Sequence, residues 1–272
     1  MTITTRDLLI TAMASNHTRV VIDKASLANA AAGQIFSLWA ATGLPGAGAT
    51  PSTAAVCTSA LAGAISFPNQ TAPTESYLAW LSMVNNTNSG GGIEIHDRLA
   101  HMGGLSGTVT TAQGALSLVT TAPSADRIGA ADYSEVQWWL EVYTALGATG
   151  VNATVNVTYN DDTTGNLAAV ALGATPRAGR VYQLVSAVAG KYIKAVNSVT
   201  LSATTGTAGN FGITATRGRT VVPFNLVNTP LVQDWAQLGM PEVYNDACLA
   251  MLVSCSSTTT GAVRGLAKIA HG

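Results

Sequence analysis

The sequence predicts a mainly β protein made of two β-sandwich (jelly-roll-like) lobes, with a short helical, loop-rich N-terminal segment. The clearest indication is residues 151–159, where apolar and polar residues alternate strictly, as in a strand with one buried and one solvated face. Short apolar runs separated by turn residues recur at intervals of roughly 8–12 residues, which favours a sandwich or jelly roll over a βαβ fold. With 272 residues the chain is near the upper limit for a single core, so we expect a lobe at 1–104 that carries the helical and loop arm, and a β-sandwich lobe at 105–272.

Helix signals gather near the N-terminus. Thr5 can cap a helix over residues 6–14, because its hydroxyl can accept a hydrogen bond from the first turn. Residues 43–48 combine proline with repeated glycine and predict an irregular loop, as in a surface loop or an interaction arm. Between these segments the pattern predicts strands at 20–22 and 34–39 and an alanine-rich turn of helix at 26–32.

The rest of the chain is predicted to be strands and turns. The clearest hairpin runs from Val151 to Leu172, with turn residues at 160–165. Similar sequences at 78–81 and 249–252 are each followed by a polar turn and another strand, which predicts either a related hairpin in each lobe or a chance similarity. Further strands are predicted at 77–84, 93–99, 136–143, 181–188, 196–203, 211–216, 249–254 and 262–269, and a docking loop at 226–241.

Charge is scarce along the chain. Only 10% of the residues are charged, 47% are apolar, and the formal net charge is −1. From Ala25 to Thr74 there is no Asp, Glu, Lys, Arg or His. A free monomer with so little surface charge tends to self-associate, so we expect neighbouring subunits to cover much of the surface. The alternative is a soluble protein solvated by neutral Thr, Ser and Asn. Without clustered Lys and Arg, we expect neither nucleic acid nor a membrane as a partner.

The cysteines indicate a reducing compartment. Cys57, Cys248 and Cys255 are an odd set without a CxxC pair or zinc-finger spacing, so we expect small buried thiols in a protein that folds in the cytosol. Arg6 and Asp7 interrupt the N-terminus before any long apolar stretch, which predicts no secretory signal. No run of about 20 apolar residues predicts a transmembrane helix.

The histidine cluster does not predict a metal site. His96 and Asp97 would point to opposite faces of a strand, so they could not bind one ion together with His101. Ser106 lies in Gly-Leu-Ser-Gly, which is not the Gly-x-Ser-x-Gly elbow of a hydrolase nucleophile. We therefore expect no catalytic residue, no metal and no cofactor, and hence no enzyme.

The aromatic residues suggest contact surfaces. Glu135 and Glu141 flank Trp138 and Trp139, but two acids around a strand do not by themselves make the facing pair of a glycosidase. Adjacent strand residues point to opposite faces, so at most one tryptophan should join the core while the other faces a subunit interface or a sugar ring. The interface candidates are Trp39, Leu44, Pro45, Trp138, Trp139 and Trp235.

One stretch resembles a known family. The run Asp97-Arg98-Leu99-Ala100-His101-Met102-Gly103-Gly104-Leu105-Ser106, followed by Thr110-Thr111-Ala112-Gln113, is similar to a recurrent segment of tailed-bacteriophage virion structural proteins. The resemblance covers roughly residues 77 to 272, and the chain departs from the family pattern at 122–127. It implies a virion component without fixing its position in the particle.

From this resemblance we expect a virion protein assembled in the host cytoplasm, and specifically a capsid-associated auxiliary protein that decorates, cements or caps the shell. Its partners would be the phage major capsid protein or other virion proteins, together with further copies of itself, for example in a trimer. Many weak contacts repeated by symmetry would hold it in place. The alternatives are a tail or baseplate structural protein and a carbohydrate-binding receptor module.

Overall fold

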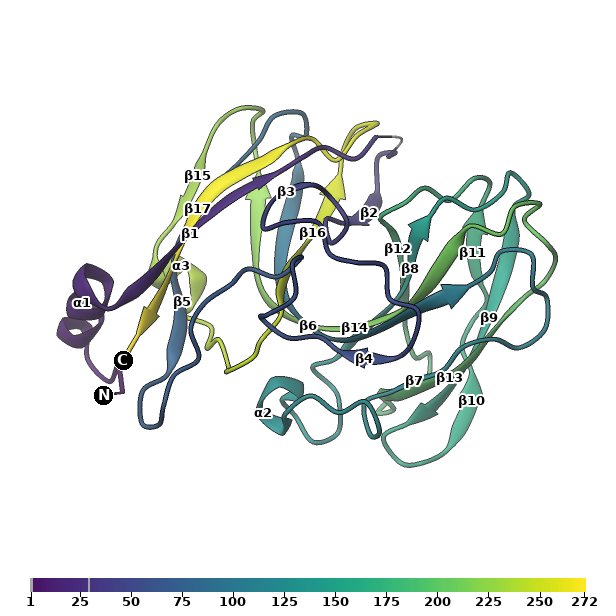
Figure 1. Cartoon of the computed structure of the whole chain (residues 1–272), viewed down its shortest axis with the longest axis horizontal. Coiled ribbons are helices and arrows are strands. Elements are labelled where there is room, and N and C mark those ends of the chain that lie inside the picture. Colours follow the sequence, from purple (N-terminus) through teal and green to yellow (C-terminus); the bar gives the residue numbers. More distant parts are fainter. Residues whose placement is uncertain (1, 29) are drawn as a thin grey trace.

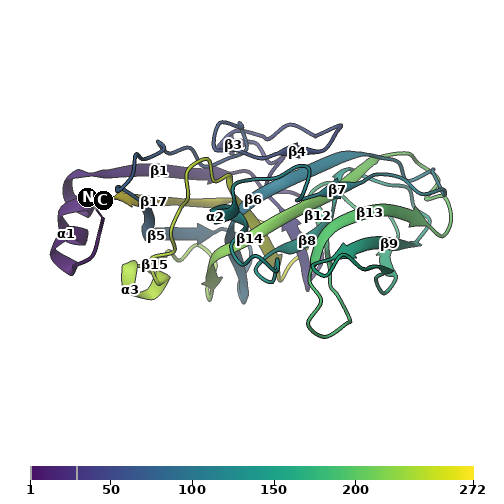
Figure 2. The same ribbon diagram turned by 90° about the horizontal axis from the view of Figure 1, so that it is seen from below.

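The computed structural model describes residues 2–28 and 30–272, and over this range the chain is mainly β, as predicted. The strands of the described residues form three antiparallel sheets, joined by loops and short helices. Figure 1 shows one sheet at each end of the molecule and the largest sheet between them. Both termini lie at the end that carries the helix α1 (Arg6–Ser15), as Figures 1 and 2 show.

The central sheet closes on itself. Its strand β14 pairs with β8 on one side and with β6 on the other, so that six strands of the described chain form a closed ring. A closed ring leaves its members without a free edge. The ring runs in the order β14 (Asn210–Phe224), β8 (Gln137–Thr144), β12 (Arg180–Leu184), β2 (Gln34–Ser37), β16 (Leu249–Cys255) and β6 (Gly91–Leu105), and β4 (Ala55–Val56) is added on β6.

A flanking sheet lies on each side of the ring. The first has the order β15 (Leu231–Gln233), β5 (Ser76–Asn85), β17 (Val263–His271), β1 (His17–Lys24) and β3 (Gly43–Leu44). The second has the order β10 (Thr164–Asn166), β9 (Val151–Tyr159), β13 (Ile193–Leu201) and β7 (Leu116–Ser117), and β11 (Val170–Gly173) also pairs with β9.

Apolar side chains join the ring to both flanking sheets. One buried cluster contains Ile95 of the ring and Leu81 of the first flanking sheet. Another contains Leu140 of the ring and Val155 of the second flanking sheet. Each fully buried side chain of this size contributes about 1.5–3 kcal/mol, so these two layers hold the ring between the sheets.

Two local predictions are confirmed and one is wrong. Thr5 Oγ1 accepts a hydrogen bond from Leu8 N at 3.3 Å and caps α1. The predicted hairpin is formed by β9 with β10 and β11, and buried and more exposed residues alternate along β9. The turn of helix predicted at 26–32 does not form in the described residues, where the chain is irregular and Ala28 instead bridges to Thr259. Residue 29 of that segment lies outside the described residues.

The two similar segments do not form hairpins, so that prediction is wrong. β5 pairs with β17, and β6 pairs with β16. After each segment the chain therefore passes from one sheet to another at the polar turn. β5 and β17 lie in the first flanking sheet, whereas β6 and β16 lie in the ring. The connections at 86–90 and 256–262 are long enough for this change of sheet.

Candidate functional site

Both faces of β8 are covered by protein. Trp138 Nε1 donates a hydrogen bond to Ile193 O at 2.8 Å, so Trp138 points toward the second flanking sheet. The alternate residues Trp139, Glu141 and Tyr143 therefore point the other way, into the ring. Trp138 and Trp139 are 1% and 3% exposed. The expectation that one of them faces outward is wrong, because the closed ring covers the second face of the strand.

A buried ion pair spans the ring interior. Arg98 Nη2 of β6 lies 2.7 Å from Glu141 Oε2 of β8, with β14 between the two strands. The same nitrogen donates to Tyr143 Oη at 2.8 Å and to Thr214 Oγ1 at 3.1 Å. Burial by itself would raise the pKa of Glu141, but the charge and hydrogen bond of Arg98 outweigh it and hold that pKa below its usual value.

Next to this ion pair lie His101 and two thiols. Arg98 Nε donates to His101 Nδ1 at 3.1 Å, so the other ring nitrogen, Nε2, carries a proton. Burial raises the pKa of the Cys57 thiol, but the neighbouring Cys248 thiol, the His101 ring and the Arg98 charge outweigh burial and lower that pKa. The neighbouring Cys57 thiol, and then burial, raises the pKa of Cys248, so Cys57 is the more acidic thiol.

The opposite face of β6 carries a second buried ion pair. Asp97 accepts two hydrogen bonds from Arg127 of α2 (Ala125–Ile128), one from Nε at 2.9 Å and one from Nη2 at 2.7 Å. Asp97 Oδ1 also accepts a hydrogen bond from Cys248 N at 2.9 Å. This bidentate geometry is the strong form of an arginine–carboxylate pair. It ties α2 and the start of β16 to β6.

His96 is a buried histidine on the same face of β6 as Arg98. Within the described part of the chain, neither of its ring nitrogens has a hydrogen-bond partner. Burial, and then the charge of Arg98, lowers the pKa of His96 to about 3, so the ring is neutral at pH 7. His96 and Asp97 lie on opposite faces of the strand, and they cannot bind a single ion together.

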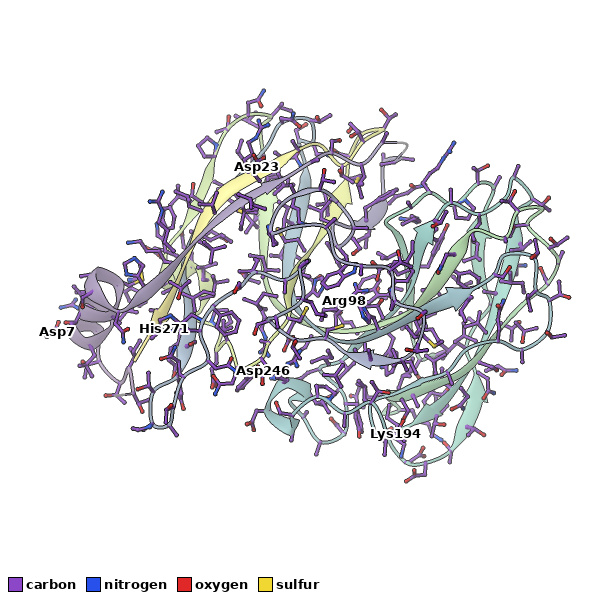
Figure 3. The ribbon with its side chains drawn as sticks, viewed as in Figure 1. Asp7, Asp23, Arg98, Lys194, Asp246 and His271 are labelled. Carbon is purple, nitrogen blue, oxygen red and sulfur yellow. The ribbon has the colours of Figure 1, made fainter. Side chains whose placement is uncertain are left out.

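A capping arm, residues 38–66, crosses the opening of the ring (Figure 1). The Trp39 ring of this arm lies over the Arg98 guanidinium at 4.6 Å and meets the His101 ring edge-on at 5.5 Å. Gly48 and Gly63 pack against the Trp39 ring so closely that an added Cβ would come within 2.1 Å and 2.6 Å of it. The arm therefore closes the polar interior with an aromatic ring. Figure 3 shows Arg98 near the middle of the molecule.

Lys24 fastens the capping arm to β1. Its Nζ donates hydrogen bonds to Ala41 O and Gly46 O, both at 2.9 Å. Burial lowers the pKa of Lys24 to about 8. The two residues of β3 extend the same attachment by pairing with Asp23 and Lys24.

A groove of about 460 Å³ opens beside the capping arm. Val56 and Thr58, the neighbours of Cys57, form part of its wall. Arg127 also lines the groove but is committed to Asp97. The acidic side chains that line it are Glu75, Asp126, Glu242 and Asp246.

The predicted interface residues divide into buried and exposed groups. Trp39, Trp138 and Trp139 lie in the interior and offer no surface to a partner. Leu44 is 55% exposed, Pro45 is half-buried, and Trp235 of α3 (Trp235–Leu238) is 40% exposed. The structure brings Leu44 and Pro45 together in one groove, and Trp235 lies elsewhere.

The acidic pair considered from the sequence does not converge on one site. Glu141 pairs with Arg98 inside the ring, whereas Glu135 pairs with Arg217 at the surface. Each carboxylate thus has its own arginine. The network around Arg98 and Arg127 was not predicted, although Asp97, Arg98 and His101 of this network lie in the run that carries the family resemblance.

Comparison with known proteins gives no family assignment. The chain matches no model of a known protein family, and no curated protein is significantly similar to it. A structure of the Gx strain of infectious bursal disease virus is 11% identical, with 94% of this chain and 80% of that chain covered, at a TM-score of 0.20. The VP2 subviral particle of the same virus is 9% identical, with the same coverage, at a TM-score of 0.16. Scores this low carry no argument about fold or function.

Among the helices of residues 2–28 and 30–272, none combines the length and the apolar character that a membrane span needs. In the same residues, no group of three His, Cys, Asp or Glu side chains is placed to hold a metal ion.

Proposed function

We propose that the chain is a bacteriophage virion structural protein, a capsid-associated auxiliary protein that acts through subunit–subunit contacts. The observation that carries this proposal is the uncharged outer surface of the capping arm. The arm lies within the stretch from Ala25 to Thr74, which has no charged residue. Its exposed residues include Leu44 and the alanines 47, 49, 54, 55, 60 and 62.

The apolar surface continues from the capping arm onto β1. A groove of about 500 Å³ between them is lined by Val20, Val21, Leu44, Pro45 and Leu61, and Arg19 of β1 is the charged side chain in its lining. Contiguous apolar side chains around such a groove are typical of protein contact surfaces. A surface of small neutral side chains also loses little hydration when another protein covers it, because it carries no charge to desolvate.

The interior supports the same proposal. Two arginines and two carboxylates form ion pairs inside the described fold, where they link strands and a helix. A chain with few charges that buries several of them has fewer left to keep it soluble as a monomer. Symmetric association would then cover the neutral faces.

We propose that each flanking sheet and the ring strands packed on it form one jelly-roll-like lobe, with the expected division between residues 104 and 105. Strands after residue 248 pair with strands from the first hundred residues, so in this proposal the C-terminal strands β16 and β17 belong to the first lobe and the rest of 105–272 forms the second.

Copy number tests the capsid position. Particles of the phage that encodes the chain should contain hundreds of copies by quantitative mass spectrometry if the protein decorates the shell. A few dozen copies or fewer would instead favour the tail or baseplate alternative. Complete absence from purified particles would overturn the virion proposal altogether.

Surface variants test the contact itself. Leu44→Asp and Val21→Asp should lower self-association and incorporation into particles, because they place a charge on the neutral face. Val188→Asp is a matched control, since Val188 is 48% exposed against 49% for Val21 and lies in a loop before β13. Equal behaviour of all three variants in light scattering and in particle binding would refute the assignment of this face.

The third alternative, a carbohydrate-binding module, rested on Trp138 and Trp139. Both rings are buried, so a sugar would have to be bound by other residues. Glycan-array binding by the purified chain would favour this alternative over an assembly role.

A further inference from the structure

The strand register places Cys57 and Cys248 next to each other. β14 covers one edge of β6 over nearly its full length, so β4 and β16 share the other edge. Cys57 N donates to Leu99 O at 3.0 Å, and Arg98 N donates to Cys248 O at 2.8 Å. The two cysteines thus oppose consecutive residues of β6. The backbones of the two cysteines therefore lie next to each other along this edge of β6.

The side chains of these cysteines also meet. Both belong to the buried cluster that includes Trp39 and Ala250, and each thiol is close enough to shift the pKa of the other. His101 also lies near the Cys57 sulfur, and Arg98 places positive charge nearby. A thiolate is the reactive form of cysteine, and positive neighbours favour it. Both cysteines are free thiols in this structure.

We propose that Cys57 and Cys248 form a redox-active dithiol, which a small oxidant of the peroxide class converts into an intramolecular disulfide. This inference goes beyond the proposed virion role and does not depend on it. The bond would tie the capping arm to β16 of the ring, two segments that are 191 positions apart in sequence (248 minus 57). Covalent closure of so long a loop restricts the unfolded chain strongly.

The oxidant reaches the pair from the acidic groove. Val56 and Thr58, on either side of Cys57, line this groove, and β4 is held to β6 over only two residues. A pairing this short opens locally at low free energy, so a molecule of peroxide size gains access without global unfolding.

The chemistry balances in two steps. The Cys57 thiolate attacks one peroxide oxygen and the O–O bond breaks, which gives a sulfenic acid and, after proton uptake, one water. The Cys248 sulfur then attacks the sulfenic sulfur, the S–O bond breaks, and a second water leaves with the thiol proton. In sum, two thiols and one hydrogen peroxide give one disulfide and two waters.

Cys255 provides an internal comparison. It is buried in the apolar cluster between the ring and the first flanking sheet, and its Sγ lies 3.9 Å from Val253 O. Burial raises the pKa of Cys255 to about 11, which disfavours the thiolate. Reactivity toward peroxide should therefore separate Cys57 and Cys248 from Cys255.

The test uses the reduced, full-length native protein and hydrogen peroxide. Before alkylation the intact mass should fall by two hydrogens. After quenching, denaturation and alkylation, one of the three cysteines should carry the label, and a peptide map should show Cys57 joined to Cys248. Loss of these two thiols should be at least about tenfold faster than loss of Cys255. Cys255→Ser should give the same disulfide, whereas Cys248→Ser should stop at a sulfenic acid that dimedone traps on Cys57.

The measurement on the wild-type chain decides the proposal even if a variant fails to fold. Three alkylated thiols after peroxide treatment would overturn it, and so would a cross-link that contains Cys255. Oxidation of Cys57 to the sulfinic acid while Cys248 stays free would also overturn it, because the two sulfurs would then not be within bonding reach.

Discussion

Replacing Glu141 by Gln tests whether the ring interior depends on its ion pair. The side chain keeps its shape, but Arg98 loses the carboxylate 2.7 Å from its Nη2 and remains charged in a fully enclosed position. Removal of one partner from a buried pair typically destabilises a protein by about 3–5 kcal/mol. For a chain of this size the melting temperature should then fall by roughly 6–15 °C.

The matched control for this change is Asp23→Asn. Asp23 Oδ1 lies 3.0 Å from Arg264 Nε, but both side chains are more than half exposed. Water and salt screen such a pair, so its loss should change stability by less than about 1 kcal/mol. Urea unfolding of both variants gives the comparison. A Glu141→Gln protein as stable as the control would refute the reasoning that the interior charge needs its partner.

The pH dependence supplies a second check on the same residue. The pKa of Glu141 is below its usual value in the folded chain, so the unfolded chain binds a proton more readily. The carboxylate therefore adds stability above the ordinary glutamate pKa of about 4.3, and this contribution is lost as the pH falls toward the folded value. The stability difference between wild type and Glu141→Gln should shrink below about pH 4.

The other predictions concern three buried positions. Between about pH 6.5 and pH 3 the unfolded His96 ring takes up a proton while the folded ring, with a pKa of about 3, stays neutral, so the wild type loses stability as the pH falls. His96→Leu should reduce this loss by up to ~1.4 kcal/mol per pH unit. Urea midpoints between pH 7.5 and 4.5 measure the slope, and an unchanged slope would contradict the prediction. Gly48→Ala should lower the free energy of unfolding by about 1–3 kcal/mol and shift tryptophan fluorescence to the red, because the added Cβ would lie 2.1 Å from the Trp39 ring. The control Gly46→Ala should have little effect, since its Cβ would meet nothing closer than 3.4 Å. Asn88→Ala should lower the free energy of unfolding, measured by chemical denaturation, by about 1–3 kcal/mol, because Asn88 Oδ1 accepts hydrogen bonds from Ser256 N (2.8 Å) and Ser257 N (3.1 Å). A change near zero would show that water replaces the Asn88 oxygen as acceptor.

The sequence predicts local elements well where one face of a strand is exposed to solvent. Along β9 the alternation of valine with asparagine and threonine matches the alternation of burial. Thr5 caps α1 because capping depends on neighbours in sequence. Such signals need no knowledge of distant contacts, which explains why helix and hairpin were found.

Ring closure leaves no comparable signal. β8 is covered on both faces, so Glu141 and the two tryptophans are all buried. Its sequence therefore has no alternation that would indicate which side chains point into the ring. The closing pair, β14 with β6, joins residues more than 100 positions apart, as in Val222 with Ile93. Pairing at that separation is decided by the whole chain, and local patterns do not specify it.

The uncharged stretch from Ala25 to Thr74 has an internal cause that composition alone did not reveal. Trp39, Cys57 and Ala64 of the capping arm are buried on its inner side, where they pack with Tyr143 and other residues. A charged side chain at these positions would be buried without a partner. Part of the charge deficit thus follows from the fold, and only the exposed part of the arm supports the assembly proposal.

A double replacement, Arg98→Met with Glu141→Leu, separates two roles of the polar interior. Tyr143 and Thr214 lose their charged partners but stay 3.4 Å apart and can hydrogen-bond to each other. Apolar replacement of a whole buried ion pair is often neutral or stabilising, so the double variant should lie within about 2 kcal/mol of wild type and well above Glu141→Gln. If the double variant is this stable, the role of the ion pair is to favour one arrangement of the ring strands over others, because only one strand register brings Arg98 of β6 next to Glu141 of β8. Hydrogen exchange of β6 and β14 would then be faster in the double variant at equal global stability. A double variant as unstable as Glu141→Gln would show instead that the ion pair supplies net stability to the ring.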